Sequence, residues 1–533
     1  MNKQAPSIFN DVIGPVMRGP SSSHVAGGAR IGALLRQACG NDPKKVILDF
    51  DINGSLAESH DGHGTDMGFS CGLLGIPLTD ERMDRYETLI KDAGIDLSFR
   101  ILDYGAMHPN HYRMYAVTGC GEELQMDAIS TGGGMVEAIS LNGFSISMMG
   151  DFYEYCIVIS DDMTNSGKIN LSAEMLNGML SARIPMFEYA TISSKDDSSM
   201  IECKCSAKWT KEVHTYIEET LHPSHIYSFE PVLPTHSARV CNVPFRTAEE
   251  CEKYNQGKNL ELFELALLYE SMRGNTSKEI VWNQMKELLH IMQRAVRDGL
   301  SGTEYEDRIL HVQSPMIGQA MQARTLVPGT VMNQIITYIT AIMENKSSMG
   351  VIVAAPTVGS CGCLPGTVTG LADALSLDED TAVKGLLAGG LIGVFFAAQA
   401  TFAAEVGGCQ VECGAGSGMA AAAVTQMMGG TAVECIDAAS VALQGLTGLA
   451  CDPVANRVEV PCLNKNIVGG MNALSSTNMI LSGFDKVIPL DETIKAMYDI
   501  GLKLPLELRC TYGGLGKTKT SGEIRKKLES GQK

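Results

Sequence analysis

Positive charge is scarce in this sequence. Its 533 residues include 42 Lys and Arg against 61 Asp and Glu, so the formal net charge at pH 7 is −19. This excess of negative charge argues against a nucleic-acid backbone or an anionic membrane surface as the main partner. We therefore expect a small-molecule partner, with no nucleic acid and no membrane involved.

A targeting segment is missing from the place where one would be expected. The first ten residues carry neither a basic stretch followed by an apolar run nor an amphipathic pattern rich in Arg and Ser. We therefore expect a cytoplasmic protein. In that compartment the 16 cysteines would be reduced thiols, metal ligands or core residues rather than disulfides.

One apolar stretch tests the expectation that no membrane is involved. Residues 385–404 are apolar apart from Gln399 and Thr401, and the stretch just reaches the length of a membrane span. It is rich in Gly and Ala, however, and lacks a flanking aromatic or basic belt. We interpret it as a buried helix in a large helical core.

A chain of this length is expected to form two or three domains. Strands alternating with helices predict a mixed α/β domain over residues 1–140. A β-α-β-β-α order, with a first strand at 144–149, resembles a small ferredoxin-type regulatory unit of the ACT kind over 141–235. After residue 250, a capping box at 276–279 and apolar residues at helical spacing predict a large, mainly α-helical domain over 250–533. The predicted fold class is multidomain α+β.

Three cysteines in the last third of the chain stand in distinctive loops: Gly407-Gly408-Cys409-Gln410, Cys451-Asp452-Pro453 and Pro461-Cys462. They are separated by 41 and then 10 residues, too far for the local C-x-x-C pairs of zinc ribbons or thioredoxin-like sites. Three thiolates would suit an iron-sulfur cluster with one iron left open. Such an iron can act as a Lewis acid on a substrate.

Other polar motifs lie on loops near helix starts. Residues 19–24 form a turn whose hydroxyls and free amides suit anion binding, or an ordinary helix cap. Residues 60–66 place two histidines among glycines, which suits acid/base or ligand work, although lone histidines are more often structural. The loop 354–366, bracketed by two prolines, suits a carboxylate or a cluster sulfide.

Taken together and in this order, the motifs resemble the iron-sulfur-dependent L-serine dehydratases, also called L-serine ammonia-lyases. The form resembled has the family's β and α regions fused in one chain, with the β-like region at about 8–135 and the α-like region at about 255–516. The matching motifs are Gly19-Pro20-Ser21-Ser22-Ser23-His24, Gly62-His63-Gly64-Thr65-Asp66, His108-Pro109-Asn110, Gly132-Gly133-Gly134, Ala355-Pro356-Thr357, Glu405-Val406, Cys409-Gln410, Cys451-Asp452-Pro453, Val460-Pro461-Cys462 and Asn466.

The resemblance implies an oxygen-sensitive lyase of amino-acid catabolism and gluconeogenesis, which eliminates water from L-serine to give pyruvate and ammonia. It implies a [4Fe-4S] cluster held by Cys409, Cys451 and Cys462, with the open iron taking the substrate. His63 would be the base or a carboxylate partner, and His24 would be the second catalytic residue. Substrate binding would fall to Ser22, Ser23, Thr357, Gly359, Ser360 and Asn466. We expect a homodimer that acts on a small amino acid.

Several departures from the family pattern concern the substrate more than the cluster. Gln444-Gly445-Leu446 stands where a Glu-His-Asn run is usual, and Lys465 stands where a planar, bidentate arginine is usual. Two alternatives therefore stay open. The same cluster could serve a cysteine desulfidase or a dehydratase of another β-hydroxy amino acid. Alternatively, the cysteines could bind structural zinc in an amino-acid sensor.

Overall fold

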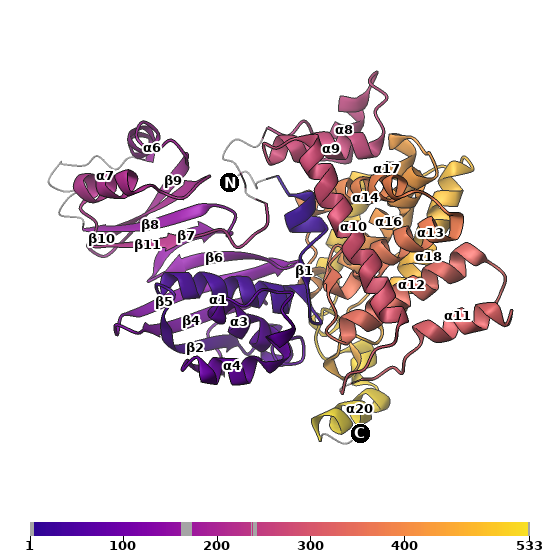
Figure 1. The fold of residues 1–533 in the computed structure, drawn as a ribbon, viewed down its shortest axis with the longest axis horizontal. Helices are drawn as coiled ribbons and strands as arrows, with labels where there is room; N and C mark the ends of the chain where they lie inside the picture. Colours follow the sequence, from indigo (N-terminus) through magenta and orange to yellow (C-terminus); the bar gives the residue numbers. More distant parts are fainter. Residues whose placement is uncertain (1–4, 161–172, 236, 238–241, 307, 531–533) are drawn as a thin grey trace.

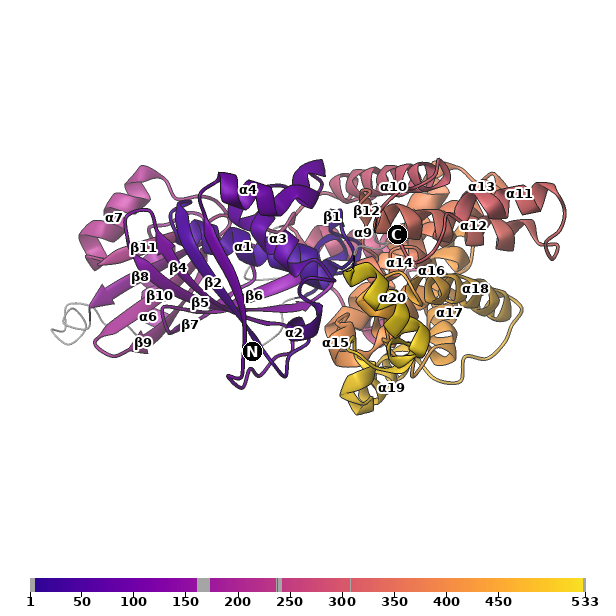
Figure 2. The same cartoon turned by 90° about the horizontal axis from the view of Figure 1, so that it is seen from below.

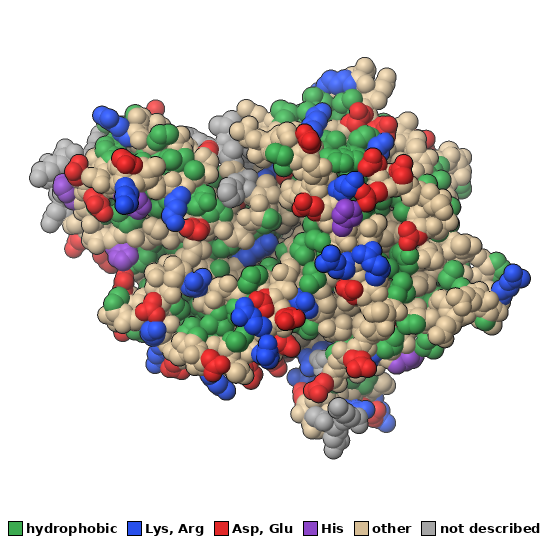
Figure 3. All heavy atoms as spheres, viewed as in Figure 1, with side chains coloured by type: hydrophobic (Ala, Val, Ile, Leu, Met, Phe, Trp, Pro, Cys, Tyr) green, Lys and Arg blue, Asp and Glu red, His purple; other side chains and the backbone are tan. Residues whose placement is uncertain are grey.

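The computed structural model describes residues 5–160, 173–235, 237, 242–306 and 308–530. Two sheets with their helices form one side of the molecule, and a large group of helices forms the other (Figure 1). This arrangement confirms the predicted multidomain α+β fold, with a mixed region followed by a large helical region. On the face drawn in Figure 3, Lys and Arg side chains intermingle with Asp and Glu across both sides.

The N-terminal region is built on a six-stranded sheet in the order β3-β2-β4-β5-β6-β7, in which the β2–β3 pair is parallel. Buried and accessible residues alternate along β4 and β5, because α1 and α3 cover one face of the sheet. The elements are η1 Ile8–Val12, β1 Val16–Met17, η2 Ser22–Ala26, α1 Gly27–Ala38, β2 Pro43–Asp51, α2 Leu56–Ser59, α3 Thr65–Leu74, η3 Glu81–Arg85, α4 Tyr86–Asp92, β3 Asp96–Leu102, β4 His111–Thr118, β5 Glu123–Gly132, β6 Met135–Leu141 and β7 Phe144–Met148.

Strand β7 belongs to this first sheet, although the sequence places residues 144–149 in the middle unit. It pairs antiparallel with β6. The two strands are joined by Asn142 and Gly143, which both have positive φ, at 51° and 82°. An Asn-Gly pair in this conformation makes the tight turn of a β-hairpin. The sequence therefore contained a hairpin signal, an Asn-Gly pair between two runs of alternating apolar and polar residues.

The middle region has a ferredoxin-like topology. Its elements run β8 Tyr153–Ser160, α6 Ala173–Ser181, β9 Phe187–Lys195, β10 Ser198–Cys205, α7 Lys211–Leu221 and β11 His225–Phe229. The sheet order is β11-β8-β10-β9, with every pair antiparallel. Helices α6 and α7 pack on one face, and the other face contributes Cys156 and Met200 to the core of the first sheet. The ferredoxin-type expectation is confirmed, and a regulatory role stays a prediction.

The C-terminal region is helical and encloses the largest core. Its elements are α8 Ala248–Asn255, α9 Leu262–Arg273, α10 Lys278–Leu300, α11 Ser314–Gln322, α12 Thr330–Ser347, β12 Ile352–Val353, η4 Val358–Ser360, α13 Cys363–Leu375, α14 Glu379–Gln399, α15 Ala404–Gly407, η5 Cys409–Val411, α16 Cys413–Met427, α17 Ala432–Gly445, η6 Val454–Asn456, α18 Cys462–Leu481, α19 Leu490–Lys503, η7 Leu506–Leu508, η8 Gly514–Lys517 and α20 Lys519–Glu529.

Helix α14 contains most of the apolar stretch. By length and composition it could cross a membrane, but 78% of its most apolar window is buried inside the structure. It packs against α9 and α16. These contacts confirm that the stretch forms a core helix of the helical region.

The N-terminal segment joins the two sides of the molecule. Strand β1 pairs antiparallel with β12, so that Val16 lies opposite Val353. Before it, η1 packs on α14, where a Cβ on Gly393 would lie 2.1 Å from a methyl group of Val12. Glu270 of α9 accepts hydrogen bonds from the backbone N–H of Ile8 at 2.8 Å and from a serine hydroxyl. Residues 8–17 therefore pack against the helical core before the chain enters the first sheet.

Glycines allow α3 to touch the backbone of η2 and α1. A Cβ on Gly68 would lie 2.1 Å from the carbonyl oxygen of Val25, and a Cβ on Gly72 would lie 2.1 Å from that of Ala29. Both distances are too short for any side chain, so only glycine permits this approach. The contact fixes η2, and with it residues 22–24, relative to α3.

We expect Gly68→Ala to lower the free energy of unfolding by roughly 1–3 kcal/mol, the usual cost of overpacking, because the new methyl group must push η2 away. The measurement is the midpoint of urea unfolding. Gly318→Ala in α11 is the matched control, since its Cβ would meet nothing within 4 Å, and it should be neutral or slightly stabilising. Equal midpoints for the two variants would contradict this account of the α1–α3 contact.

Candidate active site

Two serines of η2 reach from the sheet-containing side to the helical side. The Ser22 hydroxyl accepts a hydrogen bond from the N–H of Val358 at 3.2 Å, and the Ser23 hydroxyl donates to Glu405 at 2.9 Å. Val358 begins η4 and Glu405 lies in α15. Both contacts therefore lie on the seam between the two sides, which Figure 2 shows from below. The substrate-binding role that the family resemblance implies for both serines stays a prediction.

His24 is buried and hydrogen-bonded at both ring nitrogens. Its Nε2 lies 2.8 Å from the hydroxyl of Ser59, which donates to the carbonyl of Ser55 at 2.7 Å. Since Ser59 gives its hydrogen to Ser55, it accepts from His24, and the ring proton is on Nε2. Nδ1 then accepts from the hydroxyl of Ser21 at 3.0 Å, because Ser23 gives its only hydrogen to Glu405. The ring is held in one tautomer, and burial lowers its pKa to about 3.

His63 stands beside His24, with the ring centroids 4.7 Å apart. Its Nδ1 lies 4.0 Å from the Sγ of Cys510, whereas its buried Nε2 has no hydrogen-bond partner among the described residues. Burial, and then the neighbouring ring of His24, lower the pKa of His63 to about 3. His63 is therefore a neutral imidazole, and in the tautomer with its proton on Nδ1, facing Cys510, the unused Nε2 is the basic nitrogen.

A group of buried thiols lies next to His63. Its members are Cys409, Cys413, Cys451 and Cys510, which pack together with Ala404. Cys462, at the start of α18, belongs to the neighbouring helical core, and burial together with the thiols of Cys451 and Cys409 raises its pKa. The structure thus packs two of the three predicted ligands, Cys409 and Cys451, together, and a shared role with Cys462 stays a prediction. All fifteen described cysteines are free thiols.

Backbone and amide hydrogen bonds hold the cysteine loops together. Gln410 donates from its amide to the Gly407 carbonyl at 2.9 Å and accepts from the N–H of Gly448 at 2.8 Å. This ties the Cys409 loop to the loop that leads to Cys451. The N–H of Cys510 donates to the Cys451 carbonyl at 3.0 Å, so the C-terminal segment closes over the same loop.

Asn466 joins Cys462 to the loop around η4. Its side-chain oxygen accepts from the N–H groups of Gly362 and Cys363 at 3.1 and 2.9 Å. Its side-chain nitrogen donates to the carbonyls of Gly359 and Cys462, both at 2.8 Å. Protein groups therefore occupy both the oxygen and the nitrogen of the Asn466 side chain. The structure thus places Asn466 where it positions a thiol, and its predicted role in binding substrate stays a prediction.

The loop predicted to cradle a carboxylate already contacts one. The Thr357 hydroxyl donates to Glu412 at 2.7 Å, and a Cβ on Gly359 would lie 3.1 Å from the same carboxylate. Ser360 is buried, and its hydroxyl lies 3.2 Å from that of Thr357 and 3.3 Å from the Ala355 carbonyl. Burial raises the pKa of Glu412. Substrate binding by Thr357, Gly359 and Ser360 therefore stays a prediction.

Lys465 supplies positive charge beside the thiols. Its ammonium donates to Asp452 at 2.8 Å and to the Ala450 carbonyl at 2.5 Å, the residues that flank Cys451. A hydrogen bond from the thiol of Cys413, aided by this ammonium, lowers the pKa of Cys409 to about 7. Here lysine, in place of the expected arginine, acts as a point charge. Gln444, another departure, is exposed at the end of α17 and donates to the Lys486 carbonyl.

Buried thiols are the kind of donor that both iron-sulfur clusters and zinc sites use. Within the described ranges, no three His, Cys, Asp or Glu side chains converge closely enough to hold one ion. A single zinc needs every ligand atom at about 2.0–2.3 Å from one centre, whereas a cluster takes its thiolates on different irons. Three buried thiols on separate loops suit the second arrangement.

Three side chains at the site were not predicted as functional. Glu405 precedes the Cys409 loop in an otherwise apolar stretch, and that isolation is a usable sequence signal. Cys510 was not among the expected ligands, and its Sγ lies 4.0 Å from Nδ1 of His63. Lys346 lies in the last turn of α12, an amphipathic helix of ordinary pattern, and is 1% exposed. Nothing local in the sequence distinguishes it from a surface lysine.

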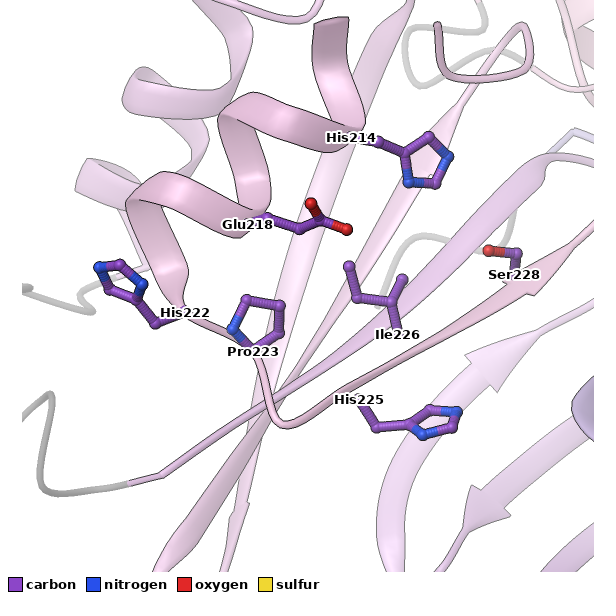
Figure 4. A pocket seen from close by; sticks show the side chains of 7 residues that line it. All are labelled: His214, Glu218, His222, Pro223, His225, Ile226 and Ser228. Carbon is purple, nitrogen blue, oxygen red and sulfur yellow. The ribbon is translucent and has the colours of Figure 1, made fainter. Parts of the chain in front are cut away.

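A separate hollow of about 610 Å³ lies in the ferredoxin-like unit, far from the thiols (Figures 1 and 4). His214, Glu218 and His222 border it from the α7 side, and His225 and Ser228 border it from β11. The imidazoles point in different directions in Figure 4. The hollow therefore lacks the convergent groups of a catalytic site, and the thiol and histidine group on the seam is the candidate.

Comparisons with known proteins match both parts of the chain. A family model described as the serine dehydratase alpha chain matches residues 257–515. The probable L-serine dehydratase alpha chain of Bacillus subtilis (strain 168) is 34% identical over 288 residues, 54% of this chain and 96% of that protein. The L-serine dehydratase alpha chain of Peptoniphilus asaccharolyticus is 31% identical over 282 residues, 52% of this chain and 97% of that protein.

A second kind of relative accounts for another part of the sequence. The probable L-serine dehydratase beta chain of Bacillus subtilis (strain 168) is 41% identical over 169 residues, 32% of this chain and 75% of that protein. A region related to the alpha chain and a region related to the beta chain are thus joined in one polypeptide. The chain belongs to the L-serine dehydratase family.

Proposed function

We propose that this protein is an L-serine ammonia-lyase that eliminates water from L-serine and yields pyruvate and ammonia. The observation that carries the proposal is the packing of Cys409, Cys451 and Cys510 together, with Cys510 beside His63, at a seam between regions related to the alpha and beta chains of L-serine dehydratases. Family membership also favours an enzyme over the alternative of a zinc-binding sensor.

The three thiols would hold a [4Fe-4S] cluster, for which their burial and their separate loops are suitable. When bound, such a cluster supplies a Lewis acid that eases the departure of the substrate's β-hydroxyl. The protein's part is to keep the three loops together through Gln410 and Asn466. Lys465 offsets part of the negative charge of the thiolates.

His63 is our candidate for the base that removes the Cα proton. It is neutral and buried, and its Nε2 is unused, so it can accept a proton at that atom. His24 is bonded at both nitrogens, so it would orient the ring of His63 rather than take the proton. Loss of the proton and of the hydroxyl leaves aminoacrylate, which tautomerises and hydrolyses to pyruvate and ammonia without further help from the enzyme.

The wider setting is part of the same proposal. We propose a cytoplasmic, oxygen-sensitive homodimer that serves amino-acid catabolism and gluconeogenesis. Residues 1–140 and 250–533 would act as the β-like and α-like catalytic domains, and residues 141–235 would act as a regulatory unit. The alternative substrates, cysteine or another β-hydroxy amino acid, would use the same thiols and the same base.

The decisive experiment uses the full chain, purified and reconstituted with iron and sulfide under anaerobic conditions. It is incubated separately with L-serine, L-threonine and L-cysteine, and keto acid and sulfide are measured. We expect broad visible absorbance from the cluster and pyruvate from L-serine at the highest kcat/KM. Absence of keto acid from L-serine by the absorbing protein would overturn the choice of substrate, and release of sulfide from L-cysteine would select the desulfidase.

We expect Cys409→Ser, Cys451→Ser and Cys462→Ser each to lose most of the visible absorbance and at least about a hundredfold in kcat, because each removes one thiolate ligand. Cys120→Ser is the control, since Cys120 is exposed on the first sheet's side of the molecule. It should retain both properties. Full absorbance in any of the three variants would remove that cysteine from the ligand set.

His63→Asn should lower kcat by about 10²- to 10⁴-fold, the usual contribution of a general base, with cluster absorbance unchanged. His24→Asn should have a smaller effect, because His24 acts through the orientation of its neighbour. Steady-state kinetics of the two reconstituted variants provide the measurement. A larger loss for His24→Asn would reverse these two roles.

The buried histidines predict that acid weakens the fold. The pKa of His24 and of His63 is lowered to about 3 in the native state, against about 6.5 when unfolded. Below pH 6.5 the unfolded chain therefore binds more protons than the native state does. The free energy of unfolding consequently decreases as the pH is lowered. Each histidine should contribute a loss of about 1.4 kcal/mol at pH 5.5 relative to pH 8. Urea unfolding at both pH values should give a smaller loss for His63→Asn than for the wild type.

A further inference from the structure

Glu405 is a buried carboxylate that makes no ion pair with a Lys or Arg in the described part of the chain. It lies in α15 at the seam and is 4% exposed. Its Oε1 accepts a hydrogen bond from the Ser23 hydroxyl at 2.9 Å and lies 3.7 Å from Nδ1 of His24. Burial lowers the pKa of His24 to about 3, so this ring is neutral. Burying a charge without an opposite charge is costly, and a cationic group of a ligand would remove that cost.

The position of this carboxylate is fixed by the backbone around it. Glu405 is the one charged residue in the stretch 385–411. Just before it, the chain lies directly against the end of β5, because a Cβ on Gly132 would lie 2.7 Å from the backbone nitrogen of Ala403. Only glycine permits so close an approach. The carboxylate is therefore held on the seam by protein contacts alone.

The cations around the site are directed to other groups. Lys465 donates to a neighbouring carboxylate at 2.8 Å, and Lys346 donates to a backbone carbonyl. Arg457 lies against the loop that carries the two site histidines of residues 60–66, where a Cβ on Gly62 would lie 2.9 Å from its guanidinium. Among the described residues, none of these three cations forms an ion pair with Glu405. A ligand is therefore left to balance the charge of this carboxylate.

A proton acceptor lies close to the same carboxylate. The ring of His24, whose Nδ1 is 3.7 Å from Glu405, is in edge contact with the ring of His63, and the ring centroids are 4.7 Å apart. The buried Nε2 of His63 has no hydrogen-bond partner among the described residues. In an amino acid, the α-ammonium and the Cα–H belong to one carbon atom. A ligand whose ammonium contacts Glu405 would therefore carry its Cα–H to the same part of the seam as His63.

We propose that Glu405 binds the α-ammonium of the substrate. This inference rests on the proposed lyase activity and deepens it: the substrate class is restricted to acids with a free α-amino group, and the corresponding hydroxy acids are excluded. The competing role for Glu405 is to dock the two sides of the molecule through Ser23 and nothing more. The two roles differ in what is lost when the charge is removed and the hydrogen bond is kept.

The test compares Glu405→Gln, whose amide oxygen can still accept from Ser23, with Ser23→Ala, which keeps the charge and loses the bond. Each reconstituted protein is titrated calorimetrically with L-alanine, which has no β-hydroxyl to lose, and with propionate, its counterpart without the ammonium. The wild type should bind L-alanine at least about tenfold more tightly, the value of one charge-assisted hydrogen bond. Glu405→Gln should lose this preference, and Ser23→Ala should keep it.

Turnover and unfolding provide two further readouts. Glu405→Gln should raise KM for L-serine by about 10- to 100-fold, with a smaller change in kcat and unchanged cluster absorbance. Glu523→Gln, which removes an exposed carboxylate of α20, is the matched control and should equal the wild type. In urea unfolding, Ser23→Ala should have the lower midpoint of the two seam variants, because it leaves the buried carboxylate without its donor.

The outcomes separate this inference from the proposed function. Wild-type protein that forms no keto acid from L-serine would overturn the proposed lyase, whereas the binding comparison does not depend on turnover. Equal affinities of the wild type for L-alanine and propionate would overturn the ammonium site without any variant. A preference for L-alanine that survives in Glu405→Gln would leave the carboxylate with the docking role alone. If Glu405→Gln fails to fold, Glu405→Asp, which withdraws the charge by one methylene group, should lower the preference, and an unchanged preference would contradict the proposal.

Discussion

The hydrogen bond from Ser23 to Glu405 joins the two sides of the molecule at the candidate site. His24 and His63 belong to the sheet-containing side, and the thiols belong to the helical side, so neither side holds a complete site. The bond is buried, and breaking it would leave a desolvated carboxylate without its donor, which is costly. The arrangement of the histidines and thiols therefore depends on the docking of the two sides more than on either fold alone.

Several backbone contacts hold the sheet-containing side against the helical side. Strand β1 pairs with β12, and η1 is inserted against α14, so the start of the chain is anchored in the helical core. Gly68 lets η2 lie directly on α3 and thereby fixes the serines at the seam. Some relatives are named as alpha chains or beta chains, whereas here the two regions meet within one polypeptide. Fusion in one polypeptide converts this meeting into an intramolecular step at a high effective concentration.

Sequence patterns predicted the fold well where the information is local. Alternation predicted the strands, helical spacing predicted the core helices, and low polarity predicted α14 as a buried helix. Residues 144–149, which form β7, were assigned to the middle unit because the Asn142-Gly143 pair was not used as a signal for a hairpin with β6. The cysteines were selected by loop composition and by the family resemblance, since spacing along a chain does not determine distance in space. Lys346 and Cys510 became visible only through burial and contact, which are long-range properties.

The distribution of charge suggests how a substrate would lie. Lys465 stands with Asp452 beside Cys451 and Cys409, so its charge is already shared with a carboxylate and the thiols. Glu412 and Glu405 make the region between Thr357 and Ser23 acidic. Lys346 is the buried cation on which none of these carboxylates makes an ion pair within the described residues. An anionic ligand at this seam would therefore meet acidic side chains first, and its binding would depend on a cation that offsets them.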